Sequence, residues 1–174
     1  MKILAFAATS SSKSINKLLV SHAANLVPNA NVNIIDLNDY EMPIYSQDKE
    51  EALGIPEHAQ RFFNHIKDAD AVIVSFAEHN GSYTAAYKNV FDWASRIDMK
   101  VFQDKPVIYL ATSPGPGGAA SVLSAATNSA PYFGADVKAS LSIPSFFDNF
   151  DMEANVISND EIANNLKDAI RLIS

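Results

Sequence analysis

The chain has 174 residues, of which 48% are hydrophobic and 19% are charged, and its formal net charge is −7. The acidic balance argues against non-specific nucleic-acid binding, which depends on lysine and arginine neutralising phosphates. The absence of cysteine excludes disulfides, thiolate catalysis and cysteine-ligated metals. We expect one domain over residues 1–174, in which any anion is held by local amides and hydroxyls.

The first predicted strand leads into a hydroxyl-rich turn. Residues 1–8 are an apolar run of strand length, and residues 9–14 carry five hydroxyls and one lysine. An apolar pattern of helical period runs from Ile15 to about Leu26. A helix start offers unpaired N–H groups and a partial positive charge to an anion. We hypothesise that a cofactor phosphate lies on residues 9–16; the simpler alternative is that the serines only cap the helix.

The middle of the chain continues the alternation of strand and helix. Residues 32–37 are predicted as a second strand, and residues 38–54, which are acidic and poor in apolar side chains, mostly as a loop. A helix is predicted over residues 55–67. The continuous apolar run of residues 71–77 is typical of a central parallel strand covered on both faces. Another helix is predicted from about residue 84 to residue 97.

A fourth strand, residues 105–112, opens into residues 113–118, which hold three of the six glycines of the chain. The remaining predicted elements are a helix over about 119–132, a strand over 135–143, a long connection over 144–158 and a last helix capped by Asn159 or Asp160.

This order predicts an α/β fold, a flavodoxin-like doubly wound arrangement. Its five-stranded parallel sheet would have the order 2-1-3-4-5, with helices on both faces. In such a sheet ligands bind at the carboxyl ends of the strands, where the order reverses. The loops at that point are residues 9–14 and 77–83, with residues 112–118 beside them, and they are rich in Ser, Thr, Asn and Gly.

Each of these loops suggests a different task. The first offers hydroxyls and a helix start to a phosphate, and the second offers backbone amides to a flat polar ring. The third lets the backbone approach a ligand closely, because glycine has no side chain; alone, it reads more simply as a tight turn. A phosphate at one end and a planar heterocycle against two backbone loops describe FMN.

The second loop also carries a family resemblance. Residues 78–82, followed by Lys88-Asn89 and Asp92-Trp93, resemble the P-E-Y-N-G-S-x-P…K-N-x-x-D-W signature of the NADPH-dependent FMN reductases. Residues 9–16 resemble the phosphate loop of that family, G-S-x-R-x-x-S-x-N, with Ser11 at its arginine position, and residues 113–118 resemble its third loop. The family includes flavodoxin-like quinone, azo-dye and chromate reductases.

The resemblance implies a reaction and a set of contacts. NADPH or NADH would reduce bound FMN, which would pass electrons to a small-molecule acceptor such as a quinone, an azo compound, a metal oxyanion or free flavin. No catalytic side chain and no metal are expected. The implied cofactor-binding residues are Thr9, Ser11, Ser14, Ile15 and Asn16 at the phosphate, and Glu78, His79, Asn80, Gly81, Ser82, Ser113, Gly115 and Gly117 at the ring.

The resemblance further implies a homodimer or homotetramer, to which the aromatic residues Tyr45, Tyr83, Phe146 and Phe147 could contribute. Lys88 and Asp92 are spaced for an ion pair on one helix, and Trp93 reads as a core or interface residue. No segment approaches 18 apolar residues and no signal-peptide pattern is present, so we expect a cytoplasmic protein without membrane partners.

Two other functions stay open at this point. One is a flavodoxin-type electron carrier without a substrate site of its own, and the other is a flavin-free relative that acts as a sensor or scaffold. A carrier usually places its ring between aromatic side chains, and the loop over residues 113–118 has none. A response-regulator receiver would need an acidic cluster after the first strand, where this chain has threonine and serine.

Overall fold

The computed structural model describes residues 1–174. At its centre is a parallel sheet with the strand order β2-β1-β3-β4-β5, which confirms the predicted topology. The strands match their predicted ranges to within two residues: β1 (Lys2–Ala8), β2 (Asn31–Ile35), β3 (Ala71–Phe76), β4 (Lys105–Thr112) and β5 (Ala135–Ile143).

Burial along the strands follows from their place in the sheet. Every residue of β3 is buried, whereas the edge strand β5 alternates between exposed and partly buried positions. Side chains of a strand point alternately to its two faces, so the apolar run of β1 feeds two cores. Leu4 and Phe6 join one core, and Ile3 and Ala5 join the other.

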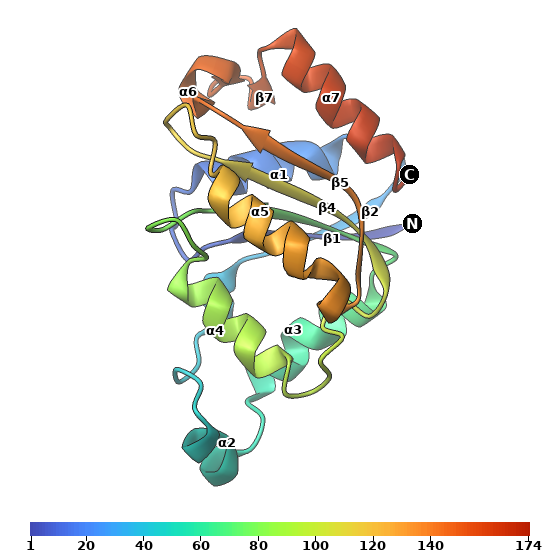
Figure 1. Ribbon diagram of the computed structural model, residues 1–174. Helices are drawn as coiled ribbons and strands as arrows, with labels where there is room; N and C mark the ends of the chain where they lie inside the picture. The colour runs from blue at the N-terminus through green and yellow to red at the C-terminus, as the bar shows by residue number, and fades with distance from the viewer.

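Helices cover both faces of the sheet (Figure 1). One face carries α3 (Glu57–Asp68), α4 (Ala85–Ala94) and α5 (Ala120–Ser129), and the other carries α1 (Ile15–Asn25) and α7 (Asp160–Arg171). Each of these helices buries an apolar stripe, such as Val90, Trp93 and Ala94 on α4. None of the helices combines the length and the apolar content needed to cross a bilayer.

Two helix ends differ from the prediction. The helix α4 ends at Ala94 rather than residue 97, and turns follow it. The helix α5 ends at Ser129, and the 3-10 helix η2 (Ala130–Phe133) continues it. Proline at the second position of η2 lacks the N–H that an α-helix would use there, and Gly134, with a φ of 66°, ends the segment.

The expectation of a loop over residues 38–54 is wrong, because this segment contains two helices. The 3-10 helix η1 (Leu37–Tyr40) comes first, and α2 (Gln47–Leu53) lies away from the sheet in Figure 1. No residue of α2 is buried. Ser46 caps it at the start, and Gly54 ends it with a φ of 71°. Local capping and helix-forming residues therefore form α2 without the apolar stripe that would have revealed it.

The connection over residues 144–158 also has structure. It contains the short helix α6 (Phe146–Asn149) and an antiparallel hairpin of β6 (Phe150–Asp151) and β7 (Val156–Ile157). The carboxylate of Asp151 accepts the N–H groups of Glu153 and Ala154 in the turn. Two-residue strands are too short to leave a periodic pattern in the sequence.

Candidate functional site

Three polar loops meet at one edge of the sheet. They follow β1, β3 and β4, which are neighbours in the sheet and run in the same direction, so their carboxyl ends lie together. We name them the first loop (residues 9–14), the second loop (residues 77–83) and the third loop (residues 113–119). This is the edge at which the strand order reverses, as the sequence predicts.

The first loop presents unpaired backbone donors. The N–H of Ser11 donates to Thr9 Oγ1, and the N–H of Asn16 donates to the capping Ser14 Oγ. No protein acceptor receives the N–H groups of Ser10, Ser12, Lys13, Ser14 and Ile15. Five free donors beside the start of α1 are a set of the kind that binds an anion.

Thr9 and Asn16 lie beneath this donor set, and both are buried. The Asn16 side chain bonds twice to the backbone of Thr112: Nδ2 donates to the carbonyl oxygen and Oδ1 accepts the N–H, each at 3.2 Å. Oδ1 also accepts the hydroxyl of Ser75 at 2.7 Å. Asn16 therefore ties the start of α1 to β3 and β4, and its side chain is occupied within the protein.

The second loop is a tight turn. His79 and Ser82 exchange both backbone hydrogen bonds, at 3.0 and 3.2 Å, and Asn80 and Gly81 between them have φ values of 54° and 75°. Two successive positive φ values define a type I′ turn, for which Asn-Gly is the preferred pair. All four residues are exposed, and the N–H groups of Asn80 and Gly81 have no protein acceptor.

Two side chains fix the second loop to its neighbours. The Thr84 hydroxyl caps α4 by accepting the N–H of Tyr87, and it donates to the carbonyl of Ala8 at 2.9 Å. Glu78 Oε2 accepts the N–H of Val122 at 2.9 Å, in the first turn of α5. The helix α5 has no capping side chain of its own, so the Glu78 carboxylate supplies the missing acceptor.

The third loop is held in shape by hydrogen bonds to the carbonyl of Gly115 and by close packing at Gly118. The carbonyl of Gly115 accepts the N–H of Gly118, the N–H of Ser145 and the hydroxyl of Ser113. A Cβ at Gly118 would collide with Ser142 Oγ and lie 3.0 Å from Pro144 N, and its φ is 57°, so packing requires glycine there. At Gly115 and Gly117 a Cβ would meet nothing within 4 Å.

The charges near the first loop are unevenly paired. Lys17 Nζ lies 2.6 Å from Asp36 Oδ2, whereas Lys13 is exposed and belongs to none of the ion pairs of the structure. Lys13 is therefore the free cation of this loop.

A groove of about 350 Å³ opens beside Ser10, between η1 and the first turns of α4.

The Lys17–Asp36 pair predicts a loss of stability in acid. The hydrogen bond from Lys17, with those from Asn38, holds the pKa of the Asp36 carboxyl below its usual range. A depressed pKa in the folded state stabilises the protein above about pH 4, and this contribution is lost as the pH falls through the folded value. Asp36→Asn should therefore lower the denaturation midpoint more at pH 7 than at pH 3.

Chemical denaturation at the two pH values measures this difference. Lys17→Met removes the hydrogen bond that lowers the pKa of Asp36 most. In this variant the stability should therefore depend less on pH than it does in the parent. If Asp36→Asn lowers the denaturation midpoint by the same amount at pH 3 and pH 7, the assignment is contradicted.

Sequence reasoning placed the three loops together but missed the groups that join them. Ser75, Thr84 and Thr112 are buried polar residues with internal partners. Serine within an apolar strand is the signal that could have identified Ser75. The predicted Lys88–Asp92 ion pair is present at 2.6 Å, and Trp93 is a fully buried core residue whose Nε1 donates to the Pro43 carbonyl.

Of the four aromatic residues suggested for an interface, Phe146 alone is ruled out by burial. Phe146 is fully buried and stacks on Phe150, and half-buried Tyr83 packs against Phe76 of β3. Tyr45 packs edge-on against Trp93. Phe147 alone among the four suggested residues is exposed.

Comparison with protein families matches residues 1–148 to the NADPH-dependent FMN reductase family. The chain is 34% identical over 121 residues to an NAD(P)H-dependent FMN reductase of Pseudomonas aeruginosa, across 69% of this chain and 64% of that protein. It is 36% identical over 109 residues to a 2-hydroxy-1,4-benzoquinone reductase of Burkholderia sp., across 62% of this chain and 57% of that protein. The matches thus span less than two thirds of these relatives.

Among solved structures, the fold resembles FerB, a flavoenzyme NAD(P)H:(acceptor) oxidoreductase from Paracoccus denitrificans. The TM-score is 0.77 at 22% identity, over 99% of this chain and 94% of FerB. An azoreductase from Bacillus anthracis matches with a TM-score of 0.65 at 19% identity, over 99% of this chain and 98% of that one. At these identities the structural likeness establishes a shared fold.

Proposed function

The chain belongs to the NADPH-dependent FMN reductase family, and from this premise we propose that it is an NAD(P)H-dependent, FMN-containing reductase. It would pass electrons to a small acceptor such as a quinone, an azo compound, a metal oxyanion or free flavin. The names of the Pseudomonas and Burkholderia relatives support FMN, NAD(P)H and a quinone as the partners of the reaction.

The observation that carries this proposal is the set of five free N–H groups in and just after the first loop. Ser10, Ser12, Lys13, Ser14 and Ile15 would hold the FMN phosphate, and the exposed hydroxyl of Ser11 would add a donor. The protein is acidic overall, so this anion is held by local dipoles and by Lys13. Buried Thr9 and Asn16 would support these groups from below.

The second and third loops fit a flat ring. The free N–H groups of Asn80 and Gly81 can bond to ring oxygen and nitrogen atoms, and Ser82 and His79 are exposed beside them. The space beside Gly115 and Gly117 is open, because a Cβ built there meets no atom within 4 Å, and a ring can therefore approach the backbone. Ser113 and Glu78 would act by holding these loops in shape.

When bound, FMN supplies the hydride and electron chemistry of the reaction. The residues of the chain bind and orient it, and no side chain need serve as nucleophile or general base. The three links made by Asn16, Thr84 and Glu78 keep the donor groups in place, so little ordering is required on binding. The groove beside Ser10 offers partly apolar space for the acceptor.

The carrier alternative is less well supported. The third loop has no aromatic side chain, and the Tyr83 ring packs inward, with its centroid 5.9 Å from that of Phe76. Neither loop therefore offers the aromatic sandwich of a carrier, and an open ring face suits a reductase. Steady-state oxidation of NADPH with a benzoquinone separates the two: turnover supports the reductase, and bound FMN without turnover supports the carrier.

We further propose that residues 1–174 act as one FMN-binding domain in a cytoplasmic homodimer or homotetramer. Exposed apolar side chains on and near α2 support self-association: Ile44 is 77% exposed and Leu53 is 65% exposed. Sedimentation equilibrium of the purified protein tests this point, and a monomer would contradict it.

Ser14→Glu tests the phosphate position. A carboxylate at this helix start would repel the phosphate, and we expect FMN affinity to fall at least tenfold, about 1.4 kcal/mol. Ser46→Glu is the matched control, because Ser46 caps α2 outside the three loops. FMN titration followed by quenching of flavin fluorescence measures both variants. Equal affinity in the parent and Ser14→Glu would place the phosphate elsewhere.

A further inference from the structure

A second cavity lies on the helical side of the sheet, between α4 and α5. Its volume is about 260 Å³, and β3 and β4 form its floor. Ten of its 14 lining residues are hydrophobic, including the aromatic rings of Phe76, Phe91 and Phe102. None of the residues proposed to hold FMN lines it. It is therefore separate from the three loops, although Tyr83 belongs to both the cavity wall and the second loop.

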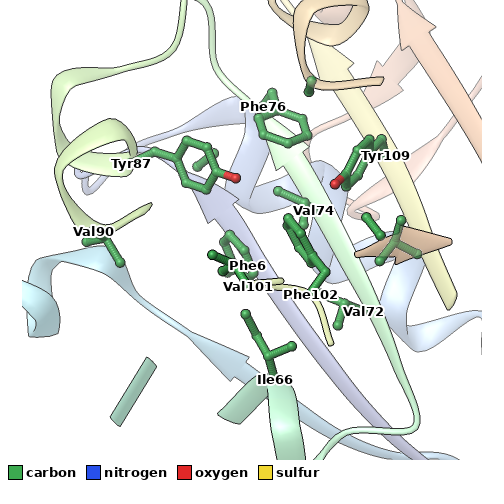
Figure 2. Close-up of a cluster of buried hydrophobic side chains, with 14 of the residues drawn as sticks. Phe6, Ile66, Val72, Val74, Phe76, Tyr87, Val90, Val101, Phe102 and Tyr109 are labelled. Atoms are coloured by element: carbon green, nitrogen blue, oxygen red, sulfur yellow. The ribbon is translucent and has the colours of Figure 1, made fainter. Parts of the chain in front are cut away.

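Two tyrosine hydroxyls open into this cavity without a protein partner. Tyr87 is 4% exposed and Tyr109 is 2% exposed, and neither hydroxyl takes part in a hydrogen bond of the structure. Both hydroxyls remain reachable from the cavity. The only side-chain polar atom that is fully enclosed and lacks a partner is His58 Nδ1. In Figure 2 the two hydroxyls point toward one another below Phe76.

The chemistry of the walls restricts what can fill the space. Burial raises the pKa of both Tyr87 and Tyr109, so both hydroxyls remain protonated and can donate hydrogen bonds. Lys88 and Asp92 at the rim neutralise one another at 2.6 Å, so the lining has no net charge. Both residues line the cavity and neither hydroxyl has a protein partner, so both are free to donate to a molecule that enters it.

We propose that this cavity is a second binding site, for a neutral one- or two-ring aromatic molecule that carries a hydrogen-bond-accepting oxygen. The aromatic walls pack against the rings of the ligand, and Tyr87 and Tyr109 donate to its oxygen. A cavity of about 150 Å³ holds one benzene ring, so 260 Å³ accommodates one or two rings. The site goes beyond the proposed reductase activity and does not depend on it.

The test is calorimetric titration of the purified protein, saturated with FMN, with 2-naphthol, which is not an electron acceptor. We expect saturable binding with one site per chain. Tyr87→Phe and Tyr109→Phe keep the shape and remove one donor each, so each should weaken binding about three- to tenfold, the range for one hydrogen bond. Tyr132→Phe is the matched control, because Tyr132 is 76% exposed and lies outside the cavity. This variant should bind 2-naphthol with the affinity of the parent.

Two further measurements locate the ligand. Amide chemical shifts should move at Phe91, Phe102 and Ala126 and not at Ser12 or Gly81. Ala126→Leu fills the cavity from α5 and should abolish binding. If that variant does not fold, the two tyrosine variants decide the question. Absence of saturable binding, parental affinity in both tyrosine variants, or shifts confined to the three loops would overturn the proposal.

Discussion

Replacing Asn16 by alanine should lower the free energy of unfolding by about 3 kcal/mol, a large part of the 5–15 kcal/mol typical of a domain. The side chain of Asn16 satisfies the Thr112 N–H and the Ser75 hydroxyl, and both of these residues are buried. Alanine leaves both donors without an acceptor. The link between the first and third loops is lost as well, so FMN affinity should fall together with stability.

Urea denaturation at pH 7 measures this loss, with Asn128→Ala as control. Asn128 is exposed on α5 and bonds only to Ser124 Oγ, at 3.4 Å, so its replacement should change stability by less than about 0.5 kcal/mol. Ser75→Ala removes one of the same bonds, so its effect should be smaller in the Asn16→Ala background than in the parent. Parental stability of Asn16→Ala would show that the link carries no energy, and strict additivity with Ser75→Ala would show that the Asn16–Ser75 hydrogen bond carries none.

The second large effect is expected from Gly117→Val, which should weaken FMN binding at least a hundredfold, about 2.7 kcal/mol, while stability changes little. The protein itself leaves the Cβ position of Gly117 open, and its φ lies outside the left-handed region. The fold has room for a Cβ here, so we expect valine to be compatible with the fold and to clash with a ring that lies on this backbone. Such a separation of binding from stability distinguishes a ligand surface from a tight turn.

Gly118→Ala is the contrasting variant, because its Cβ would collide with Ser142 Oγ. It should lose stability with or without FMN, and thermal denaturation of both variants in the absence of FMN compares them. If Gly117→Val lowers the denaturation temperature as much as Gly118→Ala, the glycine of residue 117 serves the turn. If Gly117→Val binds FMN as the parent does, the ring lies elsewhere.

The sheet and the meeting of the three loops at one edge could be predicted because both depend on local pattern and simple topology. The apolar run of residues 71–76 identifies a strand buried on both faces, and the alternation of strands and helices then gives the order that the structure confirms. A parallel sheet brings the ends of β1, β3 and β4 to one edge, so the position of the loops follows without any side-chain detail.

The side chains that join the loops could not be predicted in the same way. Asn16 meets Thr112 across 96 positions of sequence, and Glu78 meets Val122 across 44. Such pairs depend on register and loop geometry that no local pattern encodes. Asn16 and Glu78 were therefore interpreted as ligand contacts, whereas their side chains are occupied by the backbone of neighbouring elements.

Elements stabilised by local capping alone were missed for a related reason. The helix α2 has Ser46 before it and Gly54 after it but buries no residue, so periodicity gave no signal. Tyr87 and Tyr109 belong to the hydrophobic core, and the space between their hydroxyls exists only in the assembled fold.

The central claim is tested most directly by the absorbance of the FMN-loaded protein in the flavin band, under anaerobic conditions, on addition of NADPH and then of a benzoquinone. We predict that the protein retains FMN through gel filtration, that NADPH bleaches the band, and that the quinone restores it. Protein that emerges colourless after incubation with FMN, or a band that NADPH leaves unchanged, would contradict the assignment of this chain as an FMN-dependent reductase.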